Sequence, residues 1–168
     1  MFSKLEEFFN KIKPYLPPYT VAIAIPMTVG IISAVLTKDS MAIYGELKSP
    51  PLSPPAVIFP IVWSLLFLLM GISSAMIYID KEKNPEAAKM GLAWYAVSLV
   101  FNFSWSIIFF NMQAAFFALI VIVALAYSII RTIFEYRKVK PLAAYLQIPY
   151  ALWVIFAAYL NGGIWLLN

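Results

Sequence analysis

The longest uncharged stretch of the chain, MGLAWYAVSLVFNFSWSIIFFNMQAAFFALIVIVALAYSII at residues 90–130, decides the fold. A single helix of about 41 residues would be roughly 60 Å long, which is twice the thickness of the hydrocarbon core of a bilayer. The stretch must therefore fold back on itself, and Asn111-Met112-Gln113 is its only compact polar break. We predict two membrane-spanning helices here, at 89–110 and 114–134.

Three further uncharged runs, at 14–37, 49–79 and 141–168, are each long enough to cross a bilayer, which takes about 20 apolar residues. They predict spans at 18–37, 55–79 and 141–166. The chain is 63% hydrophobic and 12% charged, whereas a soluble domain is typically about 45–50% apolar and about 25% charged. Lipid must therefore be its solvent. We expect an all-α integral membrane protein, a bundle of five transmembrane helices that forms one domain over residues 1–168.

The basic residues predict the orientation of this bundle. With five spans, the N-terminus and the loops after the second and fourth spans share one side. Of the 12 Lys and Arg residues, all but Lys38 and Lys48 fall on that side. Positive charge collects in cytoplasmic loops, so we expect the N-terminus inside and the C-terminus outside, in the cell membrane of a prokaryote.

Residues 3–13 precede the first span and predict a short amphipathic helix on the inner leaflet. Ser3 and Glu6 have the spacing of a capping box, and Phe2, Leu5, Phe8, Phe9 and Ile12 would share an apolar face. Pro14 would end the helix. The alternative is a frayed terminus.

The composition excludes several kinds of chemistry. The chain has no Cys and no His, so we predict no zinc or other metal site, no haem held by His or Cys, and no Ser-His-Asp or Cys-His catalysis. The basic residues lie in short loops and form no patch, which argues against a nucleic-acid partner. No charged residue lies in the middle of a span, and this argues against an ion-coupled pump or a channel.

Three stripes of residues at helical spacing mark the faces that we expect to point inward. They are Trp63, Phe67, Met70 and Ser74; Ser98, Asn102, Trp105, Ser106 and Phe109; and Pro149, Trp153, Ala157, Leu160 and Asn161. An Asn in lipid needs a partner, so Asn102 and Asn161 should face the bundle interior. We assign Trp94 and Trp165 to the interfacial aromatic belts. The stripes are equally consistent with a ligand pocket and with plain helix packing.

Two other features leave alternatives open. The pairs Gly30-x-x-x-Ala34 and Gly71-x-x-x-Ala75 allow close helix approach, either within the bundle or between subunits. Four prolines between Pro50 and Pro55 stiffen the loop after the first span. That loop is either a lid over an aromatic cavity or a connector that resists proteolysis.

The ordered motifs of the chain resemble those of the TspO/MBR family, also called translocator protein or peripheral-type benzodiazepine receptor. The resemblance covers about residues 20–168. It rests on Tyr44, Leu47, Pro50 and Pro54-Pro55 in the loop; Phe59, Val62-Trp63 and Met70-Gly71 in the second span; Phe101-Asn102, Trp105 and Phe109-Phe110 in the third; and Pro149-Tyr150, Trp153, Ala157 and Leu160-Asn161 in the fifth.

This resemblance implies a five-helix bundle, a homodimer, and a pocket beneath the loop between the first two helices. Members of the family bind porphyrins and other tetrapyrroles, and some bacterial members are credited with light-driven, tryptophan-dependent porphyrin breakdown. The family's pocket positions fall here on Tyr44, Pro54, Trp63, Phe67, Asn102, Trp105, Ser106, Trp153, Ala157 and Leu160.

The chain departs from the family pattern in the loop and in the last helix. Ile43 and Leu52 stand where the family has Trp, which removes stacking surface from the lid. No charged residue follows Lys140, so the cholesterol motif of the animal members, a Tyr followed by a basic residue late in the fifth helix, is missing.

Three functions follow as hypotheses. The first is a membrane receptor, sensor or carrier for porphyrin-type ligands, in which aromatic rings stack on the ligand and Asn102 or Ser106 bonds a polar edge. It requires no cofactor and takes porphyrin or haem as a ligand. The second is a light-driven porphyrin-degrading enzyme with Trp63 and Trp153 as redox partners, and the third is a dimeric transporter.

Overall fold

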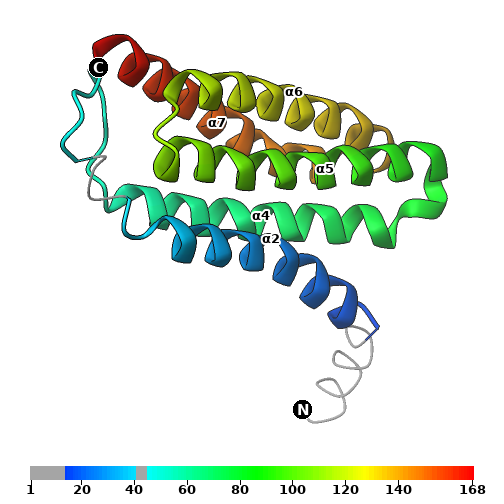
Figure 1. Ribbon diagram of the computed structural model, residues 1–168. Helices are drawn as coiled ribbons and strands as arrows, with labels where there is room; N and C mark the ends of the chain where they lie inside the picture. Colours follow the sequence, from blue (N-terminus) through cyan, green and yellow to red (C-terminus); the bar gives the residue numbers. More distant parts are fainter. Residues whose placement is uncertain (1–13, 41–44) are drawn as a thin grey trace.

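The computed structural model describes residues 14–40 and 45–168, and in these residues five long helices account for most of the chain (Figure 1). All five are long and apolar enough to cross a membrane. They are α2 (Leu16–Thr37), α4 (Ile58–Ile79), α5 (Pro85–Ser106), α6 (Ala115–Val139) and α7 (Pro141–Leu167). The five predicted spans are therefore confirmed. The predicted amphipathic helix at 3–13 lies outside the described residues.

The polar break at 111–113 separates two helices, as predicted. α5 continues into a single π-helical turn, η2 (Ile107–Asn111), and α6 begins at Ala115. Gln113 adopts a positive φ of 52° in the turn between them, a left-handed conformation that helps reverse the chain.

The main difference from the predicted boundaries is at the end of α6, which runs to Val139 rather than 134. Glu135 holds this extension together, because it pairs with Lys138 at 2.8 Å and with Arg131 at 3.6 Å along the same helix. Side chains three and four residues apart on a helix are neighbours, so a charged turn can continue the helix beyond the apolar segment.

The helices follow one another around the bundle in the order α2, α4, α7, α6, α5 (Figure 1). α2 packs along α4 and touches α5 over a shorter stretch. It also buries only Pro26, Ser33 and Thr37, whereas α4 buries nine residues. α2 is thus the outermost helix, and most of its surface faces lipid.

α2 and α4 approach most closely at glycines. A Cβ added to Gly71 would lie 2.5 Å from the Cα of Ile23 and 2.9 Å from the carbonyl oxygen of Ala22. That carbonyl lacks its usual helical partner, because residue 26 is a proline with no N–H. A Cβ added to Gly30 would collide with the ring of Phe67 in the same interface. Both small-residue pairs of the sequence therefore place their glycines in contacts within the bundle.

Proline inside a helix bends it, and Figure 1 shows the result for α2. The half that follows Pro26 runs beside α4, while the first turns diverge from α4 toward the N-terminal end. A wedge opens between the two helices at that end of the bundle.

The charges gather at the two ends of the bundle. Seven basic residues of the described chain, Lys81, Lys83, Lys89, Arg131, Arg137, Lys138 and Lys140, lie at or near the end where α2 begins and α4 finishes. We call this the basic end. Lys38 and Lys48 lie at the opposite end, which also carries the loop that leads into α4.

The glycine contact predicts different outcomes for two single-methyl substitutions. Gly71→Ala should lower the free energy of unfolding by about 1–3 kcal/mol, since the new Cβ collides with the backbone of α2. Gly162→Ala is the matched control, because its Cβ would meet only Leu119 Cδ1 at 3.8 Å. Ala is the better helix former by about 1 kcal/mol, so this variant should be as stable as the wild type or more stable. Thermal unfolding in detergent measures both, and equal stability of the two variants would contradict the assigned contact.

Candidate ligand-binding site

Five of the predicted site residues line one cavity of about 210 Å³ between α2, α4 and α5. They are Trp63, Phe67, Asn102, Trp105 and Ser106. α4 contributes the first two and α5 the other three, and α2 closes the cavity with small and polar residues, including Gly30, Ser33, Ala34 and Thr37. The inward faces predicted for the second and third spans therefore meet around a single space.

The wall of this cavity is a cluster of aromatic rings centred on Trp63. Its ring stacks on Phe67 with 5.6 Å between centroids, and it lies 6.4 Å from the ring of Trp105 and 6.2 Å from that of Tyr150. Such offset and edge-to-face pairs stabilise one another beyond their buried area. The cluster presents a preformed aromatic surface to the cavity.

Two asparagines fix this cluster in place from opposite sides. Asn102 donates from Nδ2 to the Tyr150 hydroxyl at 3.2 Å, which ties α5 to α7. Asn161 accepts a hydrogen bond of 3.0 Å from Trp105 Nε1 and donates one of 2.8 Å to the Ala115 carbonyl, which ties α7 to α5 and α6. Both side chains are buried, as the need for partners in lipid predicted.

Ala157 and Leu160 lie deeper than predicted. They line a separate cavity of only about 10 Å³, which shares Phe59, Trp105 and Phe110 with the first as a common wall. A space of that size holds at most about one water molecule. The two residues lie behind the aromatic wall, and their role in ligand binding stays a prediction.

Trp153 and Pro54 line neither of these two cavities. The Trp153 ring is half-buried, with its edge 6.0 Å from Phe59 and with Phe156 at 5.5 Å. Trp153 Nε1 is buried and has no hydrogen-bond partner among residues 14–40 and 45–168. Phe59 lies between Trp153 and the 210 Å³ cavity. Tyr44 lies outside the described residues.

The proline-rich loop is fastened to the end of α7. The Asn168 side chain accepts from the Lys48 backbone N–H and donates to its carbonyl, both at 3.0 Å, and the Tyr159 hydroxyl donates to the Pro51 carbonyl at 2.8 Å. Pro50 sits so close to Gly163 that a Cβ there would overlap its ring. Leu52, in the same loop, is 83% exposed.

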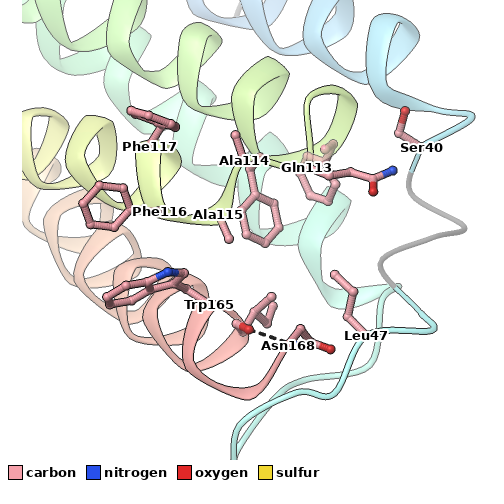
Figure 2. Close-up of a pocket in the computed structure, with 12 residues that line it drawn as sticks. Ser40, Leu47, Gln113, Ala114, Ala115, Phe116, Phe117, Trp165 and Asn168 are labelled. Carbon is pink, nitrogen blue, oxygen red and sulfur yellow. Dashed lines mark hydrogen bonds between the residues drawn. The ribbon is translucent and has the colours of Figure 1, made fainter.

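A third cavity, of about 400 Å³, lies at the end of the bundle opposite the basic end, between the turn after η2 and the last turns of α7 (Figure 2). Phe116, Phe117 and Trp165 surround one side of it, and Gln113 and Leu47 lie across from them (Figure 2). Phe109 and Phe110 also line it, and Phe110 lines the 210 Å³ cavity as well. Among residues 14–40 and 45–168, Phe110 alone lines both spaces.

Sequence reasoning did not predict that two further aromatic residues lie at these sites. The Trp165 ring packs on Phe116 at 5.2 Å and lines the 400 Å³ cavity, and its 44% exposure in the last turn of α7 agrees with the interfacial belt predicted for it. Tyr150 joins the ring cluster around Trp63. The signal available for Tyr150 was its position one turn before Trp153.

Asn111, the last residue of η2, fastens the outer end of α2 to α5. Its Nδ2 donates to the Leu36 carbonyl at 2.9 Å, and its Oδ1 accepts from the Ser40 hydroxyl at 2.9 Å. The π-helical turn inserts one residue more than an α-helical turn, and it brings Asn111 to this position while Phe109 and Phe110 stay inside.

The site offers aromatic surface, amide groups and hydroxyl groups. Within the described residues, no three His, Cys, Asp or Glu side chains come together as a group that could hold a metal ion. The arrangement can stack on a flat apolar molecule and hydrogen-bond to a polar group at its edge.

Comparison with known proteins shows which family this chain resembles. Residues 22–166 match the model of the TspO/MBR family. The chain is 35% identical over 149 residues to the tryptophan-rich protein TspO of Chlorobaculum tepidum, which covers 88% of this chain and 94% of that protein. It is 37% identical over 125 residues to protein CrtK of Rhodobacter capsulatus, with 74% and 78% covered. The translocator protein of Bos taurus is 30% identical over 153 residues, with 89% and 90% covered.

The family match at 22–166 reaches all five helices and includes every residue of the aromatic cluster. The chain belongs to the TspO/MBR family.

Proposed function

We propose that this protein is a membrane receptor, sensor or carrier for porphyrin-type tetrapyrroles and similar flat apolar ligands. The observation that carries the proposal is the ring cluster of Trp63, Phe67, Trp105 and Tyr150 beside the 210 Å³ cavity. A flat ligand would stack on these rings, and Asn102 and Ser106 offer polar groups to its edge. Names such as tryptophan-rich sensory protein, for the relative in Cereibacter sphaeroides, agree with a sensing role.

The cavity must widen to admit such a ligand. Sites for drug-sized ligands start at about 300 Å³, above the 210 Å³ between α2, α4 and α5. α2 is the wall that moves in this proposal, since it buries the fewest residues and touches α5 only briefly. Rotation of the shared Phe110 ring would add the 400 Å³ cavity at the outer end.

Metal-free porphyrin and haem are both ligands in this proposal, and no cofactor is required. The chain has no His or Cys to serve as a strong axial ligand for haem iron. Binding would therefore depend on the macrocycle and its edge, and the two forms should bind with similar affinity.

The surroundings of the protein are part of the same proposal. We place the basic end, and with it the N-terminus, on the cytoplasmic side of a prokaryotic cell membrane, following the bias of Lys and Arg. The working unit is a homodimer, as the family resemblance implies. Its interface must lie outside the two glycine pairs, because their glycines are used within the bundle.

Two tryptophan variants test the location of the site. Trp63→Ala should weaken binding of a metal-free porphyrin by about tenfold or more, since stacking on an aromatic side chain is worth roughly 1–3 kcal/mol. Trp94→Ala is the control, because Trp94 packs on Tyr127 and Arg131 near the basic end, away from the cavity. Titration of purified protein in the dark measures both affinities. Equal losses would remove the cavity as the binding site.

A pair of asparagine variants separates binding from folding. Asn102→Leu removes one long hydrogen bond and a polar group that lines the cavity, so it should mainly lower porphyrin affinity. Asn161→Leu leaves Trp105 Nε1 and the Ala115 carbonyl without partners. It should mainly lower the melting temperature, by an amount that corresponds to about 1–3 kcal/mol. The reverse pattern, measured in the same titration and a melting curve without ligand, would show that the assigned roles are wrong.

Light-driven porphyrin breakdown is the second candidate function. Trp63 lines the cavity and lies 6.4 Å from Trp105, so a porphyrin stacked there would be next to an oxidisable ring. Trp153 lies beyond Phe59. In illuminated samples containing air, we expect Trp63→Phe to abolish product formation and Trp153→Phe to slow it less. Trp94→Phe is the control and should keep the wild-type rate, because it leaves the cavity unchanged. Porphyrin loss at the same rate in light and dark, or at the wild-type rate in Trp63→Phe, would exclude this candidate. The third hypothesis, dimeric transport, is tested by uptake into vesicles.

A further inference from the structure

A cavity of about 500 Å³ lies at the basic end, far from the aromatic cluster. Its walls are the first turns of α2, the last turn of α4 and the start of α7. Tyr15, Leu16, Tyr19, Met76 and Ile79 line the apolar part. Asp80 and Lys140 line the part next to the end of the bundle.

This cavity lies in the wedge between the end of α4 and the first turns of α2. Tyr15 and Leu16 are 48% and 52% exposed, so the wedge communicates with the surroundings of the bundle through the α2 side. Those surroundings are lipid along the helices. Water fills an apolar space poorly, and an acyl chain is the available molecule that fits it.

The charged part of the cavity carries excess positive charge. Asp80 Oδ2 accepts hydrogen bonds from Lys83 Nζ and Lys140 Nζ, each at 2.9 Å. The two ammonium groups hold the pKa of the Asp80 carboxyl below its usual range, so the carboxylate is ionised and balances only one of them. The remaining charge at this end has the same sign, with seven basic residues against Asp80, Glu82, Glu86 and Glu135.

We propose that this cavity binds a phospholipid with an anionic headgroup, whose acyl chain occupies the wedge between α2 and α4 and whose phosphate contacts Lys140. The phenol rings of Tyr15 and Tyr19 lie where the headgroup and chain meet, a depth at which tyrosine is favoured. Lys140, the residue before α7, can reach the phosphate because its side chain is still 35% exposed when paired with Asp80.

Lys140 and Lys83 supply a matched test in the full-length protein. Both lysines bond to Asp80 at the same distance, but only Lys140 lines the cavity. A basic group near an anionic lipid surface contributes about 1 kcal/mol, so Lys140→Gln should weaken the binding of phosphatidylglycerol about fivefold. Lys83→Gln, which removes the same charge, should weaken it less than twofold. Native mass spectrometry and lipid-dependent melting temperatures in detergent measure the affinity.

Further binding experiments identify which molecule occupies the cavity. Phosphatidylcholine with the same acyl chains should bind several-fold more weakly, and inorganic phosphate should not displace the lipid. Ile79→Trp keeps every charge and fills the wedge, so it should abolish specific lipid binding. This variant also tests the proposal if Lys140→Gln does not fold. Equal losses in the two lysine variants, equal binding of both lipids, displacement by phosphate, or full binding by Ile79→Trp would each overturn the proposal.

Discussion

The pair of hydrogen bonds made by Asn161 is the interaction on which the rest of the site depends. One amide joins the indole of Trp105 on α5 to the first turn of α6, from a position on α7. In lipid there is no water to satisfy these groups if the amide moves, so the three helices are held in one relative arrangement. The plane of Trp105 is fixed by that arrangement, and through stacked and tilted ring contacts it also orients Trp63 and Phe109. A rigid aromatic wall thus results from a single buried side chain.

The opposite side of the cavity is built on a different principle. α2 has few buried residues and relies on close approach at Gly71 and Gly30, which is sensitive to a single methyl group. Only Asn111 and its two partners hold its outer end to α5 by side-chain hydrogen bonds among the described residues. The bonds of Asn161 therefore hold α5 from behind the cavity, through α6 and α7, whereas α2 on the other side is mainly packed. A preformed aromatic surface can therefore face a helix, α2, that moves in our proposal.

Much of this arrangement can be predicted from the sequence, because lipid imposes simple rules. The five spans, the turn at 111–113 and the burial of Asn102 and Asn161 follow from length, from polar breaks and from the need of amides for partners. Helical spacing also placed Trp63, Phe67, Asn102, Trp105 and Ser106 on two faces that meet at one cavity. Spacing does not say what lies across from a face, however. Trp153, Ala157 and Leu160 share a predicted stripe, but Phe59 and Trp105 stand between them and that cavity. Likewise, the wedge at the basic end depends on the direction of a bend at Pro26, which hydrophobic periodicity does not encode.

The bend at Pro26 makes α2 a wall of two separate spaces. Its second half closes the aromatic cavity, and its first turns form one side of the cavity at the basic end. If each ligand shifts the same helix, the two are coupled, and linkage requires the effect of one on the other to be mutual. Under the two proposals above, the lipids around the bundle would tune the affinity for the tetrapyrrole, and bound tetrapyrrole would tune how tightly the lipid is held. One proline would then connect the state of the bilayer to the aromatic cavity.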